Sequence, residues 1–180
     1  FHKAFPGTHI KVTNATSIRC VELLRSGQVD LIVVNFPNSH LDSMFTSTTI
    51  HDFQDVFIAD ETFKELRGRK MSYQELLKYP ILMLDKNSTT SEYLHALFQQ
   101  HQLDLVPEVE LSSNDLLIDL ARIGLGIAFI PDYCLTKMPE DLFLLEMKED
   151  LPKRKLALAY NSHVPVSKAA IEFMHLLQPV

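Results

Sequence analysis

Several residue types are scarce in this sequence. It has no tryptophan, two cysteines and five glycines among 180 residues. With so little glycine and only nine prolines, the composition does not favour long disordered segments. No apolar run approaches the ~18 residues of a membrane-spanning helix. Lysine and arginine number 17 against 23 aspartates and glutamates, and the net charge of −6 argues against a basic nucleic-acid-binding surface.

Metal and redox motifs are also absent from the sequence. Cys20 and Cys134 are far apart and form neither a CxxC pair nor a metal-binding spacing. Two small thiols kept reduced in the cytoplasm are the favoured interpretation, with a redox switch as the alternative. The eight histidines are scattered, so we expect no metal and no cofactor. The opening residues FHKAFPG contain neither an initiator methionine nor a signal peptide, which indicates a fragment of a longer chain.

The most informative stretch is 114–131, NDLLIDLARIGLGIAFIP. Its first ten residues predict a helix that ends before Gly124, where glycine tolerates a left-handed backbone. Residues 127–130 form an apolar run typical of a strand buried on both faces. The expected buried helix face is Leu116, Leu117, Leu120 and Ile123, and the opposite face is Asp115, Asp119 and Arg122. Helix–turn–strand units of this kind belong to layered α/β folds.

The same patterns predict further strands and helices along the chain. Residues 10–34 read as strand, helix and strand in parallel, with Ser17 as the helix N-cap. Residues 40–52 are polar and irregular, and no element is predicted there. The other predicted strands are 56–59, 81–84, 107–111, 142–147 and 156–160, and the other helices begin at 72, 89 and 165.

Loops rich in asparagine, serine and threonine recur at strand ends. They occupy residues 14–17, 35–39 and 85–90, and two of them lead into helices. In open α/β sheets ligands bind outside the carboxyl ends of strands, and helix N-termini favour anions. These loops therefore predict a site for a small acid. The alternative is that Ser17, Ser88, Thr89 and Ser113 only cap helices, and Thr89 and Glu92 have capping-box spacing.

Catalytic constellations are missing. Gly124 and Gly126 follow a helix and precede a strand, which is the reverse of a dinucleotide-binding loop. No nucleophile elbow or phosphate-binding loop is present, and Asp85 is the only carboxylate in the predicted site. We therefore expect no enzymatic activity.

Five segments together resemble the effector-binding domain of LysR-type transcriptional regulators. They follow the family's order nearly from end to end, although each alone is a moderate signal. The segments are FHKAFP at 1–6, LLRSGQVDLIVV at 23–34, LLKYPILML at 76–84, ARIGLGIAFIP at 121–131 and VSKAAIEFMHLL at 166–177.

The resemblance implies a type 2 periplasmic-binding-protein-like α/β fold, with two subdomains joined by two crossover strands around a cleft. Residues 1–55 and 161–180 would form subdomain I, lacking its first strand, and residues 56–160 would form subdomain II. The family's N-terminal winged helix-turn-helix is absent, so DNA binding is expected only in a full-length protein. Partners would be a small-molecule effector and a second copy, giving a homodimer and, in full-length protein, a tetramer.

The resemblance also assigns residues to sites. The effector would lie between the subdomains, with an apolar wall from the strand at 127–130. The implied effector-binding residues are Thr16, Ser17, Asn35, Phe36, Asp85, Asn87, Ser88, Thr89, Thr90, Ile127 and Phe129. The implied dimer-interface residues are Phe1, Phe5, Asp115, Asp119 and Arg122.

Two other functions share the predicted fold. One is an extracytoplasmic solute-binding receptor of a transporter, which an upstream signal peptide would support. The other is an enzyme, which would need a nucleophile or cofactor-bearing residue in the cleft. Regulation by a small, anionic metabolite is the favoured prediction.

Overall fold

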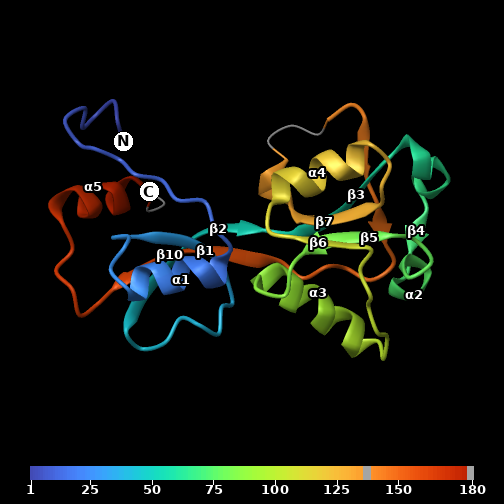
Figure 1. The fold of residues 1–180 in the computed structure, drawn as a ribbon, viewed down its shortest axis with the longest axis horizontal. Helices are drawn as coiled ribbons and strands as arrows, with labels where there is room; N and C mark the ends of the chain where they lie inside the picture. The colour runs from blue at the N-terminus through green and yellow to red at the C-terminus, as the bar shows by residue number, and fades with distance from the viewer. Residues whose placement is uncertain (136–138, 178–180) are drawn as a thin grey trace. The chain divides into compact units, whose positions relative to one another are not determined.

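The structure is a computed structural model that describes residues 1–135 and 139–177. The chain divides into two compact units. Unit 1 comprises Phe1–Asp52 and Lys155–Val180, and unit 2 comprises Phe53–Arg154. These boundaries lie a few residues before the subdomain boundaries expected from the sequence. The predicted α/β composition is observed in both units (Figure 1).

Unit 1 is built on a three-stranded sheet in the order β1-β10-β2. Helix α1 packs on it through a core that includes Val21, Leu24, Ile32 and Val34. Its elements are α1 (Ser17–Arg25), β1 (Ile32–Phe36), β2 (Phe45–Phe53), β10 (Arg154–Asn161) and α5 (Lys168–Leu177).

Three sequence predictions for unit 1 are wrong. Residues 10–13 form no strand, and Val12 is 84% exposed. Strand β1 instead pairs antiparallel with β10, so the predicted parallel strand–helix–strand unit is not formed. Residues 40–52, for which no element was predicted, contain most of β2. Most of β2 is exposed, so burial imposes no apolar pattern on its sequence.

Unit 2 is organised around a five-stranded sheet in the order β6-β5-β7-β3-β8. Strands β5, β6 and β7 run parallel, whereas β3 is antiparallel to both β7 and β8. A small parallel pair, β4-β9, stands beside it. The strands are β3 (Asp55–Asp60), β4 (Lys70–Met71), β5 (Ile81–Leu84), β6 (Val109–Leu111), β7 (Ile127–Pro131), β8 (Leu142–Leu144) and β9 (Glu146–Met147).

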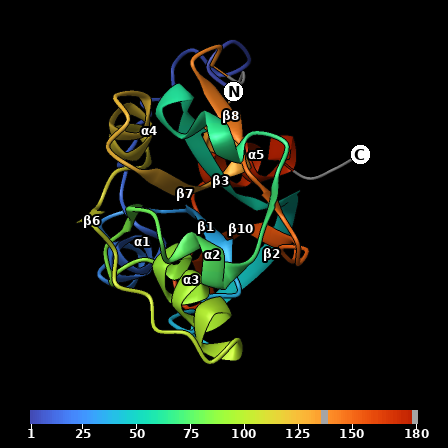
Figure 2. The same cartoon turned by 90° about the vertical axis from the view of Figure 1, so that its right-hand side faces the viewer.

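Helices cover both faces of this sheet, as Figures 1 and 2 show. Alternate residues of each strand point to opposite faces. Ile81 and Met83 pack with α3, whereas Leu82 and Leu84 pack with α4. The helical segments are η1 (Glu61–Leu66), α2 (Tyr73–Leu76), α3 (Thr89–Gln100), α4 (Asn114–Arg122) and η2 (Asp132–Cys134).

The predicted helix–turn–strand unit at 114–131 is confirmed as α4 and β7. Gly124 has a φ of +72°, in the left-handed region. The predicted buried helix face is wrong in part, because Leu116 is 48% and Ile123 74% exposed. The apolar residues of α4 cover almost two faces, and the sheet covers the one centred on Leu117, Ile118 and Ala121.

Candidate polar site at the start of helix α3

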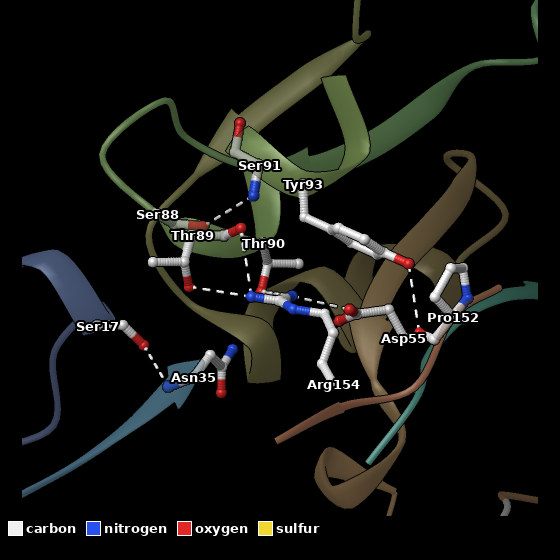
Figure 3. A network of polar contacts seen from close by, with 10 residues as sticks. All are labelled: Ser17, Asn35, Asp55, Ser88, Thr89, Thr90, Ser91, Tyr93, Pro152 and Arg154. Atoms are coloured by element: carbon white, nitrogen blue, oxygen red, sulfur yellow. Dashed lines mark hydrogen bonds and ion pairs between the residues drawn. The ribbon is translucent and has the colours of Figure 1, made fainter. Parts of the chain in front are cut away.

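Helix α3 begins with a buried run of hydroxyl side chains, Ser88–Ser91. The N-cap is Ser88, whose Oγ accepts a hydrogen bond from the Ser91 backbone N–H at 3.1 Å. The capping box predicted from Thr89 and Glu92 is therefore wrong, because the cap lies one residue earlier. As a result, Thr89 lies inside the first turn and directs its hydroxyl toward Arg154 (Figure 3).

Arg154 is the central cation of this cluster. Its Nη1 donates to Asp55 Oδ2 at 2.8 Å and to Thr90 Oγ1 at 3.4 Å. Its Nη2 donates to the Thr89 hydroxyl at 3.3 Å and to the Thr89 carbonyl at 3.4 Å. Asp55 has no exposed surface and Arg154 only 4%. A charge-assisted pair thus lies against the N-terminal turn of α3, away from solvent.

Burial dominates the electrostatics of the cluster. It raises the pKa of the Asp55 carboxyl, and the charge and hydrogen bond of Arg154 oppose that increase. Burial also raises the pKa of Tyr93 to about 12, with a further contribution from the negative charge of Asp55. Tyr93 therefore stays a neutral phenol at physiological pH and serves as a hydrogen-bond donor.

The polar loop before α3 is held by local contacts. Asp85 is half-buried, and its Oδ1 accepts a hydrogen bond from the Asn87 backbone N–H at 2.9 Å. The Asp85 N–H donates to the Leu111 carbonyl at 2.9 Å, which ties the loop to the end of β6. Asn87 is exposed. Among the sequence-predicted residues, unit 2 therefore brings together Asp85, Asn87 and the hydroxyls of residues 88–90.

The predicted residues in unit 1 form a second polar group. Thr16, and not Ser17 as predicted, is the N-cap of α1, accepting from the Arg19 N–H at 3.4 Å. Ser17 Oγ instead accepts a hydrogen bond from the Asn35 N–H at 3.0 Å, which joins α1 to the end of β1. Asn35 is 6% exposed and its neighbour Phe36 is 38% exposed.

Two apolar residues predicted to contact the effector are fully buried. Ile127 and Phe129 were expected to line a wall, but both have no exposed area. They lie in the core between β7 and α3, where the Phe129 ring is 4.7 Å from that of Phe57. Being the side chains of a central strand, they point into the layer that α3 covers. In this structure neither offers a surface to a ligand.

The predicted interface residues lie in different surroundings. Phe1 and Phe5 stack on each other at 4.9 Å, and Phe1 also meets Phe173 edge-on at 5.4 Å. Both rings are half-buried inside unit 1. In unit 2, the three predicted residues of α4 line an open hollow of about 200 Å³ and are exposed: Asp115, Asp119 and Arg122.

The surroundings of both cysteines favour the neutral thiol over the reactive thiolate. Burial raises the pKa of the Cys20 thiol, and burial together with nearby aspartates raises that of Cys134 to about 12. Within the described ranges 1–135 and 139–177, no group of three or more metal-ligating side chains is present. The helices of those ranges are also too short or too polar to cross a membrane.

Comparison with known proteins decides the family. Residues 1–180 match the family model of the LysR substrate binding domain. This chain is a LysR substrate-binding domain. The HTH-type transcriptional activator CmpR of Synechocystis sp. (strain ATCC 27184 / PCC 6803 / Kazusa) is 27% identical over 138 residues, which are 75% of this chain and 44% of CmpR. The chain thus spans less than half the length of that relative.

Solved structures agree on the fold. The CcmR regulatory domain of Synechocystis PCC6803, in complex with 2-PG, has a TM-score of 0.87 and 22% identity, covering 98% of this chain and 85% of that one. The effector-binding domain of QuiR, in complex with shikimate, has a TM-score of 0.81 and 14% identity, covering 98% and 84%. The predicted type 2 periplasmic-binding-protein-like fold of LysR regulatory domains is therefore confirmed.

Two residues central to the site were missed in the sequence. Asp55 and Arg154 are 99 positions apart, and no local motif connects them. Arg154 lies within a charged segment, 148–155, that reads as an exposed turn, although its side chain is buried. The available signal is that both charged residues begin strands, Asp55 at the start of β3 and Arg154 at the start of β10, but charged residues are common at strand ends.

Proposed function

We propose that this LysR substrate-binding domain senses a small anionic metabolite and that its first turn of α3 forms part of the binding site. The observation that supports this is the run Ser88–Thr90, where hydroxyls and the N-terminal end of a 12-residue helix lie beside the Arg154 cation. Helix N-termini and hydroxyl donors both favour an acidic group. The ligands of CcmR and QuiR, 2-PG and shikimate, are small acids as well.

The residues nominated in unit 1 remain candidate contacts of the same effector. They are Thr16, Ser17, Asn35 and Phe36, and each is tested by its own variant. Phe36 is the one with substantial exposed area, whereas Asn35 is held by its backbone bond to Ser17.

We further propose that the whole protein is a cytoplasmic transcriptional regulator without catalytic activity. DNA binding would come from a winged helix-turn-helix outside this sequence, and the assembly would be a homodimer that forms tetramers. The exposed face of α4 is the preferred dimer contact. The solute-receptor alternative is not favoured, because the family and CmpR belong to transcription regulation.

A ligand screen with matched variants tests the site. Small acids, including 2-PG and shikimate, are screened by thermal shift and their affinities measured by calorimetry. An acid at 100 times its dissociation constant should stabilise the native state by about 2.7 kcal/mol. Ser88→Ala and Thr89→Val should each weaken binding by about tenfold or more, since each removes a hydrogen bond to a charged group, worth about 1.5 kcal/mol or more.

Ser113→Ala supplies the control. Ser113 caps α4 as Ser88 caps α3, accepting a backbone bond from Leu116 at 3.3 Å. Removing either cap should lower the unfolding free energy by about 1 kcal/mol. Only the α3 variants should change affinity, and unchanged affinity in Ser88→Ala and Thr89→Val would reject the assignment.

A further inference from the structure

Arg154 contacts three different parts of unit 2 at once. Figure 3 shows the ion pair to Asp55, the bonds to Thr89 and Thr90, and the Tyr93 ring near the Arg154 guanidinium. The guanidinium also lies near a second aromatic ring, that of Phe53. The Tyr93 ring centroid is 4.8 Å from Cζ, and that of Phe53 is 5.3 Å away. Both distances fall within the range of cation–π attraction.

Helix α3 is attached to the Arg154 segment at more than one point. The Tyr93 hydroxyl donates to the Pro152 carbonyl at 3.3 Å, two residues before Arg154. Thr89, Thr90 and Tyr93 all come from the first two turns of α3. The start of the helix is therefore fixed to residues 152–154 by both polar and aromatic contacts.

Both charged partners stand where the chain passes between the units. Asp55 is the first residue of β3, and the unit boundary falls between residues 52 and 53. Arg154 is the first residue of β10, and the second boundary directly follows it. The Asp55–Arg154 pair thus connects the two crossover segments of the chain within unit 2, and the start of α3 binds to that connection.

A neighbouring ion pair shows how unusual this burial is. Lys155 Nζ and Asp52 Oδ1 are 3.2 Å apart on the same two segments, with side chains 53% and 59% exposed. Such an exposed pair contributes little to stability. A buried pair carries a large desolvation cost, so its presence is better explained by the geometry it imposes than by net stability.

We propose that Arg154 is a positioning residue that couples the first turn of α3 to the two crossover segments. Asp55 holds the guanidinium at the start of β3, and Thr89, Thr90 and Tyr93 bind it from α3. This inference rests on the proposed function in that the first turn of α3 is where the effector binds. The consequence is that ordering of that turn is transmitted to the segments that lead out of unit 2.

Two substitutions interrupt the coupling from opposite sides. Arg154→Lys keeps the positive charge for Asp55, but a lysine lacks the planar fork that reaches Asp55 and Thr89 together. Thr89→Val keeps the shape of the α3 residue and removes its hydroxyl. Lys155→Gln is the matched control, because it breaks the exposed pair on the same two segments.

Amide hydrogen exchange of the ligand-free protein measures the effect at the start of α3 and in the segment that begins at Arg154. The measured regions are residues 91–93 and residues 154–158, with residues 81–84 of the central strand reporting global unfolding. Arg154→Lys should accelerate exchange by about tenfold or more in both regions relative to 81–84, as expected for loss of a bond to a charged group. Thr89→Val should accelerate exchange at 154–158 although Thr89 lies on α3, and Lys155→Gln should change neither region.

The double variant decides between coupling and general loosening. If Arg154 joins the two regions, the effects of Arg154→Lys and Thr89→Val will be less than additive in Arg154→Lys/Thr89→Val. Additive effects, or acceleration confined to residues 154–158, overturn the proposal. Should Arg154→Lys accelerate exchange at 81–84 equally, Thr89→Val alone decides by its effect at 154–158. Acid affinities of Ser88→Ala test the proposed function separately, so either idea can fail alone.

Discussion

Glu75 is a half-buried carboxylate that contacts one neighbouring serine and two cationic side chains. Its carboxylate accepts hydrogen bonds from the Ser72 N–H at 2.9 Å and from the Ser72 hydroxyl at 3.0 Å, completing a capping box at α2. Lys148 Nζ donates to it at 2.8 Å and Arg69 Nη2 at 2.6 Å. These contacts, led by Lys148, lower the pKa of Glu75 well below its ordinary value of 4.5.

The lowered pKa predicts a specific pH dependence. Because the folded pKa is below the unfolded one, the Glu75 contribution to stability is present above about pH 4.5 and is lost as the pH falls through the folded pKa. Glu75→Gln should therefore lower the unfolding free energy at pH 7, and its difference from wild type should shrink as the pH is lowered from 5 toward ~3. Urea denaturation followed by circular dichroism measures both.

Glu92→Gln is the matched control, since Glu92 also lies in the first turn of a helix and is exposed. At pH 7, Glu75→Gln should lower the unfolding free energy more than Glu92→Gln does, because Glu75 loses its bonds to Lys148 and Arg69. A Glu75→Gln profile parallel to wild type across the whole range would contradict the assignment.

At the scale of elements, the contact between β7 and β5 depends on Gly126. A Cβ at this position would lie 2.5 Å from the Pro80 carbonyl oxygen and 2.9 Å from a Leu82 methyl carbon. The adjacent Ile127 N–H donates to the same carbonyl at 2.8 Å, so the two strands cannot separate to make room. Gly126→Ala should destabilise the native state by about 1–3 kcal/mol, as overpacking of a core does.

Gly7→Ala provides the comparison, because a Cβ at Gly7 meets nothing within 4 Å. That variant should stay within about 0.5 kcal/mol of wild type. Equal unfolding free energies for the two alanine variants in urea denaturation would show that the strand contact relaxes without cost.

The elements also show which features the sequence could predict. Strands 81–84 and 127–130 were predicted almost to the residue, because a strand buried on both faces must be apolar throughout. β2 was missed because it is largely exposed, and its polar sequence resembles a loop. The position of α4 was predicted, but its buried face was not. Six of the ten residues 114–123 are apolar, so the helical periodicity is compatible with more than one buried face.

The candidate site was likewise predicted only in part. The hydroxyl run before α3 was visible as an excess of polar residues at a strand end. The Asp55–Arg154 pair was not, because it forms only when β3 and β10 are brought together by the fold. Local sequence reports helix starts and strand burial, whereas partners far apart in the chain depend on topology.

At the scale of the whole molecule, the face of α4 that the sheet leaves uncovered predicts association. Leu116 and Ile123 are 48% and 74% exposed on a helix that also carries the exposed residues Asp119 and Arg122. Burying such side chains against a second copy would contribute about 1.5–3 kcal/mol each. Leu116→Glu and Ile123→Lys should therefore weaken self-association by about ten- to a hundredfold, measured by sedimentation velocity across protein concentrations.

The choice of charges keeps the helix itself intact. Glutamate suits the first turn of a helix and lysine the last, so neither variant should lower the unfolding free energy by more than about 0.5 kcal/mol. Val106→Lys, at a position 80% exposed outside the helices, controls for adding charge to an apolar surface residue. If Ile123→Lys sediments as Val106→Lys does at every concentration, the uncovered face of α4 is not a self-association surface.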